Sequence, residues 1–254
     1  MKWPSSITLV RHDTSAYNVL KDKKKNDPLY KEFLEAYHHQ RRSEKARILA
    51  LQVVEKFALN TSDADTPLAS EGVQAYQTGI ALNKGKLPDV VFVSPYKRAL
   101  LTLMSITYGW KELATVKAYE DERIREQEHG LANLYNDWRV FHVLHPEQEV
   151  LYEREGPYWY RYPQGESVAD VRSRNRSWLT TLTRDFAGKD VFAVTHHLNI
   201  LAMRANLERL DAHQFIRLDS KEKPINCGVT VYRGVPGEGV DGRLVLESYN
   251  IKYY

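Results

Sequence analysis

Residues 7–10 have the sequence Ile-Thr-Leu-Val, and this apolar run is followed at once by Arg11 and His12. Two further apolar runs, Val90–Val93 and Val191–Thr195, also end at polar residues. Short continuous apolar runs are typical of strands that are buried on both faces of a parallel sheet. We therefore expect three buried strands with polar side chains at their carboxyl ends.

Helical patterns lie between and after these strands. One follows Ser70, a candidate N-cap, and another follows Ser94 as N-cap with Pro95 at the first helical position. Strands alternating with helices predict an α/β layer fold. Two more strands, joined by a Gly-rich turn, are expected at Gly228–Arg233 and Arg243–Ser248. The expected helices span Glu71–Asn83, Tyr96–Tyr108, Ser167–Phe186 and Leu198–Leu210.

The segment Lys21–Leu59 differs from the rest of the chain in its charge. It combines a long helical pattern with ten Lys/Arg and six Asp/Glu residues. Charged helix faces are usually solvated, which favours a surface helical hairpin. Its positive excess also fits a cap over a site for anions. We treat residues 1–254 as a single domain that carries a helical, cap-like insertion at about 21–60.

Composition narrows the classes of protein. Hydrophobic residues make up 43% and charged residues 27% of the chain, as in globular domains. A net charge of +3 is too small to argue for nucleic-acid binding. Cys227 is the only cysteine, so neither an intrachain disulfide nor a cysteine zinc site is expected. There is no apolar run of about 18 residues and no signal-peptide pattern, so we expect a cytoplasmic protein without membrane contact.

The polar residues at the strand ends suit phosphate chemistry. The planar fork of Arg11 matches phosphate oxygens, and a neutral imidazole such as His12 is a competent nucleophile. Arg98 lies about one turn into a helix, whose N-terminus adds positive charge. His196 can donate a hydrogen bond to a phosphoryl oxygen. Each residue alone has a structural alternative, and His196 with His197 could be a metal site, although no carboxylate or cysteine stands at ligand spacing.

A phosphoester also needs a proton donor, because an alcohol leaves poorly unless its oxygen is protonated. Glu126, in the charged stretch between residues 121 and 130, is the first candidate for this acid. Glu128 is the alternative, and either carboxylate could instead belong to a solvated surface.

Taken together, these residues resemble the histidine phosphatase superfamily (branch 1), the phosphoglycerate mutase-like proteins. The resemblance extends from about residue 7 to residue 232. Any one motif is weak, but the motifs occur in the family's order. They are Arg11-His12 with Ser15 and Asn18, Leu68–Gly72, Ser94–Ala99 with Arg98, Glu126 with Gly130, Gly165–Ser167, Val194–His197 and Asn226.

The resemblance implies a three-layer α/β/α sandwich with a mainly parallel central sheet. It implies that His12 is the nucleophile and forms a phosphohistidine. Arg11, Arg98 and His196 would hold the phosphoryl group, while Glu126 would protonate the leaving oxygen and then assist water. Neither a metal nor another cofactor is expected, because these cationic groups supply the charge that Mg²⁺ supplies elsewhere. Further phosphate contacts are expected from Ser15, Asn18 and His197.

Two residues depart from the family's pattern, since Asp13 and His197 stand where it has glycine. Neither departure removes a reacting group. The sequence therefore predicts a phosphomonoesterase of the histidine acid phosphatase type that acts on a small phosphorylated substrate. The alternatives are a phosphoglycerate mutase-type phosphotransferase, whose usual tryptophan is replaced by Tyr17, and a non-catalytic protein that binds a phosphorylated ligand. The sequence carries no signal of an oligomeric state.

Overall fold

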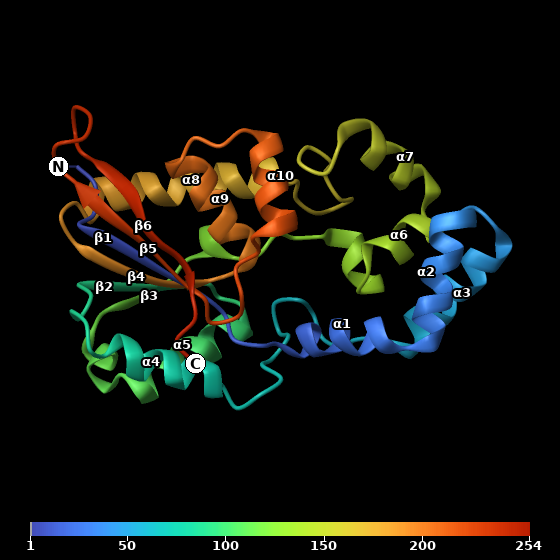
Figure 1. Ribbon diagram of the computed structural model, residues 1–254, viewed down its shortest axis with the longest axis horizontal. Coiled ribbons are helices and arrows are strands. Elements are labelled where there is room, and N and C mark those ends of the chain that lie inside the picture. Colours follow the sequence, from blue (N-terminus) through green and yellow to red (C-terminus); the bar gives the residue numbers. More distant parts are fainter. Residues whose placement is uncertain (1) are drawn as a thin grey trace. The chain divides into compact units, whose positions relative to one another are not determined.

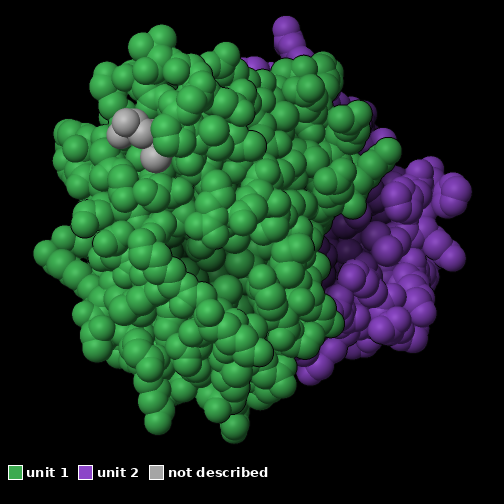
Figure 2. All heavy atoms as spheres, turned by 60° about the vertical axis from the view of Figure 1, so that its left-hand side comes forward, with its two compact units in different colours: residues 1–15, 64–126, 170–254 green, residues 16–63, 127–169 purple. Residues whose placement is uncertain are grey.

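The chain divides into two compact units (Figure 2) in the computed structural model, which describes residues 2–254. Each unit buries its own set of apolar side chains, so each has a core of its own. Unit 1 consists of Met1–Ser15, Ala64–Glu126 and Asp170–Tyr254, and unit 2 of Ala16–Asp63 and Gln127–Ala169.

Unit 1 contains a six-stranded sheet, counted over the described residues, with the strand order β3-β2-β4-β1-β5-β6. Strands β1 to β4 run parallel, whereas β5 and β6 pair antiparallel with their neighbours. The predicted strands are thus confirmed, and the short edge strand β3 is an addition. The strands span Ser6–Arg11 (β1), Val90–Val93 (β2), Ala118–Glu120 (β3), Asp190–Thr195 (β4), Val229–Val235 (β5) and Arg243–Ile251 (β6).

Helices cover both faces of this sheet (Figure 1). Helices α4 and α5 lie on one face, and α8, α9 and α10 lie on the other. This arrangement confirms the three-layer α/β/α sandwich. The helices span Val73–Leu82 (α4), Lys97–Gly109 (α5), Val168–Asp185 (α8), His197–Leu207 (α9) and Ala212–Lys221 (α10).

The central strand β4 shows why its run is apolar throughout. Ala193 belongs to the core that includes Trp178 of α8. The next residue along the strand, Val194, belongs to the opposite core with Ala99 and Ile106 of α5. Successive side chains of a strand point to opposite faces, so a strand covered on both sides has no polar face.

Two expected helix starts are wrong. Helix α4 begins after Gly72, not after Ser70, because Gly72 adopts a left-handed conformation with φ of 76°. A side chain there would meet the Ser105 hydroxyl, since an added Cβ would lie 2.1 Å from Oγ. Helix α5 begins after Tyr96, not after Ser94. The helix starts miss by only two residues, which is the usual error of a sequence-based boundary.

Unit 2 is helical. Asp27 caps α2 by accepting from Leu29 N at 3.0 Å, and Ser43 caps α3 by accepting from Ala46 N at 3.1 Å. These caps divide the long helical pattern of the insertion into separate helices. None of the helices among residues 2–254 is long and apolar enough to cross a membrane. The helices of unit 2 span Ala16–Asn26 (α1), Pro28–Gln40 (α2), Glu44–Lys56 (α3), Trp138–Leu144 (α6) and Pro146–Glu155 (α7).

A buried ion pair ties these helices together. Lys24 of α1 is 2% exposed, and its Nζ lies 3.2 Å from Asp137 Oδ2. Tyr30 of α2 donates from its hydroxyl to the same carboxylate at 2.5 Å. Asp137 also caps α6 by accepting from Arg139 N at 3.0 Å. One of the insertion's lysines is therefore part of the core of unit 2, so the positive charge of this segment is not all presented to solvent.

Candidate active site

Two strands of unit 1 deliver histidines to the same edge of the sheet. Arg11 at the end of β1 pairs with Thr195 at the end of β4. The residues that follow, His12 and His196, therefore leave adjacent parallel strands at the same level. Their ring centroids lie 5.1 Å apart. This is the carboxyl edge, where open α/β sheets form their sites.

His12 is buried and firmly held. Its Nδ1 lies 2.6 Å from the Asp13 carbonyl oxygen. Because a carbonyl oxygen can only accept, Nδ1 carries the proton and Nε2 keeps the lone pair. The backbone N–H of His12 donates to Thr195 O at 2.9 Å, and Asn226 Nδ2 donates to His12 O at 2.9 Å. The imidazole is therefore fixed in the tautomer that leaves Nε2 as a nucleophile.

Burial, together with nearby positive charge, lowers the pKa of both imidazoles. Burial holds the pKa of His12 well below its ordinary value, and the charges of Arg11 and Arg98 lower this pKa further. The pKa of His196 is also well below its ordinary value, through burial first and then the charges of Arg98 and Arg11. Positive charge has thus been gathered around two side chains that do not take up a proton at neutral pH.

His196 is oriented by two residues that follow β2. Its Nε2 lies 2.7 Å from Ser94 Oγ, and its ring meets Tyr96 edge-on at 5.2 Å. The guanidinium of Arg98 lies over the ring of Tyr96, with its Cζ 4.9 Å from the ring centroid. Tyr96 was not among the predicted site residues. Its position between Ser94 and Arg98 in the motif is the signal that could have identified it.

Two buried side-chain nitrogens at this edge have no hydrogen-bond partner within the described residues. They are Nε of Arg11 and Nδ1 of His196. Arg11 is otherwise anchored, since its Nη1 donates to Pro224 O at 2.7 Å. Burial lowers the pKa of Arg11, although the charge of Glu126 opposes this effect. Buried polar atoms without partners are costly, and an anion with several oxygens would satisfy both.

Of the two candidate acids, Glu126 belongs to unit 1 with the histidines. It follows the short 3₁₀ helix Glu122–Ile124, and its Oε1 accepts from Leu198 N in the first turn of α9 at 3.2 Å. Its charge raises the pKa of Arg11, so the two groups lie within electrostatic reach of each other. Glu126 is therefore placed beside the cluster.

Glu128 lies in unit 2 and is engaged there. Its Oε1 accepts from Asn133 Nδ2 at 2.6 Å and from Gly130 N at 3.2 Å. These bonds commit its carboxylate to the start of the 3₁₀ helix Gly130–Tyr135. They favour Glu126 over Glu128 as the acid.

The remaining predicted phosphate contacts are more dispersed. Ser15 is buried in unit 1 and forms an isolated bridge with Leu68. Asn18 lies in the first turn of α1, in unit 2. His197 begins α9, and its Nε2 lies 2.7 Å from Asp219 Oδ1 of α10, in an ion pair when protonated. Nε2 of His197 thus faces a carboxylate.

Asp13, which stands where the family has glycine, turns its carboxylate toward α4. Oδ2 accepts from Ala75 N at 3.0 Å, and Oδ1 accepts from Thr14 N at 2.6 Å. Ala75 is the third residue of α4, whose N-cap Gly72 has no side chain to offer. A distant aspartate therefore replaces the local cap, and its negative charge is favourable at a helix N-terminus.

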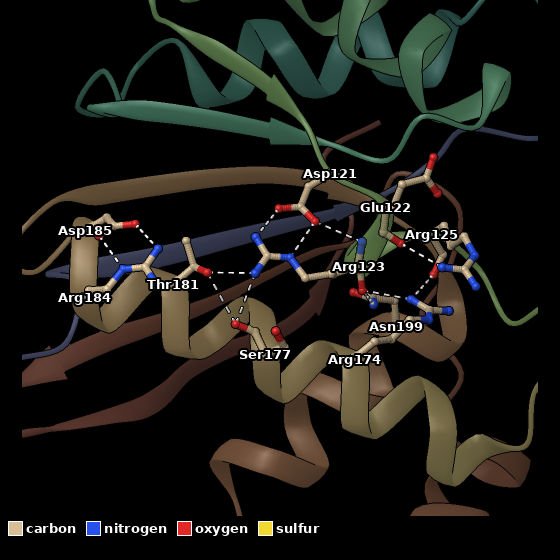
Figure 3. Close-up of polar contacts among 10 residues, drawn as sticks. All are labelled: Asp121, Glu122, Arg123, Arg125, Arg174, Ser177, Thr181, Arg184, Asp185 and Asn199. Carbon is tan, nitrogen blue, oxygen red and sulfur yellow. Dashed lines mark hydrogen bonds and ion pairs between the residues drawn. The ribbon is translucent and has the colours of Figure 1, made fainter.

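A surface hollow of about 650 Å³ lies elsewhere on unit 1 and contains none of these residues. Its Arg123 is paired with Asp121, and its Arg184 with Asp185 (Figure 3). These ion pairs neutralise much of its charge, so the histidine cluster is the better candidate for anion chemistry. The hollow is lined by Arg123, Ser173, Arg176, Ser177, Thr180, Thr181 and Arg184.

Comparison with known proteins identifies relatives. A profile described as histidine phosphatase superfamily (branch 1) matches residues 57–241. The phosphoglycerate mutase-like protein AT74H of Arabidopsis thaliana is 34% identical over 49% of this chain and 46% of its own length. Phosphoserine phosphatase 1 of Hydrogenobacter thermophilus is 28% identical over 50% of the chain and 57% of its own length. The chain thus spans about half the length of these curated relatives.

Solved structures share the fold across nearly the whole chain. A mycobacterial glucosyl-3-phosphoglycerate phosphatase in complex with inorganic phosphate is 20% identical, covers 98% of both chains and has a TM-score of 0.61. A putative α-ribazole-5′-phosphate phosphatase from Escherichia coli is 14% identical, covers 98% of this chain and 97% of its own, and has a TM-score of 0.68. At these identities, the likeness concerns the fold.

Proposed function

Because this chain belongs to the histidine phosphatase superfamily (branch 1), we propose that it is a metal-independent phosphatase that hydrolyses a small phosphomonoester through a phosphohistidine on His12. One observation carries the proposal. The Nδ1 proton of His12 is bound by a carbonyl oxygen at 2.6 Å, so Nε2 bears the lone pair, and the charges of Arg11 and Arg98 act on the same ring.

In the first step, Nε2 of His12 attacks phosphorus, the N–P bond forms and the P–O bond to the alcohol breaks. Nε of Arg11 and Nδ1 of His196, which have no partner among the described residues, donate to phosphoryl oxygens, with Nε2 of His196 accepting from the Ser94 hydroxyl. Arg98 adds positive charge at the same edge. Glu126 donates its proton to the leaving oxygen, which departs as the neutral alcohol. Fixed donors that meet charge as it develops lower the barrier without reorganising.

In the second step, water attacks phosphorus and the N–P bond breaks. The carboxylate formed on Glu126 takes the proton of that water, so the enzyme returns to its starting state. Inorganic phosphate leaves, and His12 regains its lone pair at Nε2. Two displacements at phosphorus thus use one nucleophile and one acid–base group.

The relatives support this reaction class. Phosphoserine phosphatase and glucosyl-3-phosphoglycerate phosphatase are named for small phosphomonoesters. A 2,3-bisphosphoglycerate-dependent phosphoglycerate mutase from Methanococcus vannielii is also related, at 25% identity over 65% of this chain. A mutase is therefore the second candidate. It would return the phosphoryl group to a second hydroxyl instead of to water.

The test is hydrolysis of p-nitrophenyl phosphate in EDTA by the wild type and by His12→Ala. We expect turnover by the wild type and a loss of about 10⁴-fold or more in the variant. The exposed His213→Ala variant is the matched control and should keep wild-type activity. Turnover that requires an added metal, or that survives in His12→Ala, would refute the proposal. Turnover that requires a phosphorylated acceptor or priming bisphosphate would favour the mutase.

A further inference from the structure

One arginine outside the histidine cluster holds the segment that carries the candidate acid. Arg174 lies on α8, and its Nη1 donates to Arg123 O at 2.8 Å and to Arg125 O at 2.9 Å. Its Nη2 donates to the Glu126 carbonyl oxygen at 2.8 Å. Figure 3 shows the side chain pointing from α8 to this backbone, beside Asn199 of α9. A single guanidinium thus binds three carbonyl oxygens within four consecutive residues.

Residues of β4 and α9 also bind this segment. Thr195 Oγ1 donates to Ile124 O at 2.6 Å, and Asn199 Nδ2 donates to Arg123 O at 3.2 Å. The Glu126 carboxylate accepts a hydrogen bond from Leu198 N at 3.2 Å. Thr195 and Asn199 flank the turn that contains His196. The backbone that precedes Glu126 is therefore fixed to the element that presents the phosphoryl-binding histidine.

This fixation matters because the segment has little regular structure of its own. The 3₁₀ helix ends at Ile124, and Arg125 and Glu126 follow it outside any strand or helix. A proton donor must reach its acceptor within hydrogen-bond distance. A shift of about 1 Å at such a group can lower the rate about 10²-fold. A planar guanidinium that binds several carbonyl oxygens sets both distance and direction.

We propose that Arg174 is a positioning residue for proton transfer: it holds the backbone of residues 123–126 so that the Glu126 carboxyl reaches the leaving oxygen. This inference rests on the proposed function, in which Glu126 is the acid. Arg174 acts through Glu126, and its charge, which also lowers the pKa of His196, is kept in the Arg174→Lys variant. Changing Arg174 should therefore slow the expulsion of a leaving group that needs a proton, and hardly slow the expulsion of one that does not.

The experiment compares two substrates with Arg174→Gln and Arg174→Lys. Glycerol phosphate releases an alkoxide that must be protonated, whereas p-nitrophenyl phosphate releases a stable phenolate. We expect kcat/KM for glycerol phosphate, which reports the step that expels the leaving group, to fall about 10²-fold, and kcat/KM for p-nitrophenyl phosphate to fall less than about 5-fold. Lysine keeps the positive charge but cannot bind three carbonyls as a planar fork, so Arg174→Lys should show the same selectivity.

Arg172 provides the matched control on the same helix. Its guanidinium also binds two carbonyl oxygens, those of Ala205 and Leu210, each at 2.8 Å, and it binds Asn206 Oδ1 at 3.1 Å. These acceptors lie in the last turn of α9 and in the residues just after it. Arg172→Gln should lower the melting temperature about as much as Arg174→Gln, without any selectivity between the two substrates.

A double-variant cycle with Glu126→Gln completes the test. If Arg174 acts through Glu126, adding Arg174→Gln to Glu126→Gln causes no further selective loss. Equal losses on both substrates, selectivity in Arg172→Gln, or full rescue by Arg174→Lys would overturn the inference. Failure of the proposed function looks different, because the wild type would then hydrolyse neither substrate, or His12→Ala would keep its activity.

Discussion

The two units bury a cation in opposite ways. In unit 2, Lys24 is buried against Asp137, and the opposite charge comes from within the protein. In unit 1, burial lowers the pKa of Arg11, and Nε of that residue has no hydrogen-bond partner among the described residues. Removing one partner of such a buried ion pair destabilises the fold, because the other charge is left buried without compensation. The two cations differ in this respect: the counter-charge of Lys24 lies within the chain, whereas Nε of Arg11 is left over at the sheet edge where we propose that phosphate binds.

The largest expected effect comes from removing the site cation. Arg11→Met should lower kcat/KM by about 10³-fold, or about 4 kcal/mol, because a donor to the phosphoryl oxygens is lost. The melting temperature should stay the same or rise, since an apolar side chain is easier to bury than a charge. Kinetics with p-nitrophenyl phosphate measure kcat/KM, and thermal unfolding measures the melting temperature. A large drop in stability with little loss of activity would make Arg11 a structural residue like Lys24.

The comparison also shows what the sequence could predict. The apolar runs of β1, β2 and β4 predicted the strands, and the polar residues after these strands led to His12, Arg11, Arg98 and His196 as candidate site residues. The contacts that the sequence did not reveal join distant residues. Asp13 caps a helix at Ala75, and Arg174 reaches Glu126 across 48 positions. Such partners follow from tertiary packing and not from local pattern, whereas helix and strand periodicities are local.

The next effect concerns the cation of unit 2. Asp137→Ala should destabilise the protein by about 3 kcal/mol, because it leaves Lys24 buried without its carboxylate and removes the cap of α6. Thermal or urea unfolding measures this loss. The control is Asp22→Ala, which breaks an exposed pair with Lys25 and should cost less than about 0.5 kcal/mol. The double variant Lys24→Met with Asp137→Leu should recover most of the stability. No difference between Asp137→Ala and Asp22→Ala would remove the contrast between the units.

A third test uses a buried histidine of unit 2. His142 is 1% exposed, and neither ring nitrogen has a hydrogen-bond partner among the described residues. Burial lowers the pKa of His142 to about 4, while the charge of Glu153 raises it and that of Arg41 lowers it. Between pH 6.5 and about 4, His142 is therefore protonated in the unfolded chain and neutral in the folded chain. This contribution to stability is complete above pH 6.5 and is lost as the pH falls through that window.

His142→Leu should abolish this acid sensitivity. The difference in unfolding free energy between pH 7 and pH 5 should shrink by up to about 2 kcal/mol relative to the wild type. Urea unfolding at the two pH values measures it, with the exposed His213→Leu as control. An unchanged pH dependence in His142→Leu would show that the ring is protonated or solvated in the folded chain.

The smallest expected effect concerns Asp13. Asp13→Ala should destabilise the protein by about 1 kcal/mol through loss of the α4 cap, and Asp13→Asn should cost less because an amide oxygen can still accept. The KM for p-nitrophenyl phosphate should change little in Asp13→Asn, since the carboxylate faces α4. A several-fold lower KM in that variant would place the negative charge against the substrate instead.

In the proposed mechanism, Nε2 of His12 is the atom that receives the phosphoryl group. The most direct test is an alkaline quench during the first turnover of p-nitrophenyl phosphate, followed by mass spectrometry of the digested protein. We predict one phosphoryl group on the peptide containing His12, a burst of p-nitrophenolate that matches it, and neither signal in His12→Ala. A phosphoryl group on any other residue, or wild-type turnover without a phosphorylated intermediate in a burst-resolved experiment, would contradict the account.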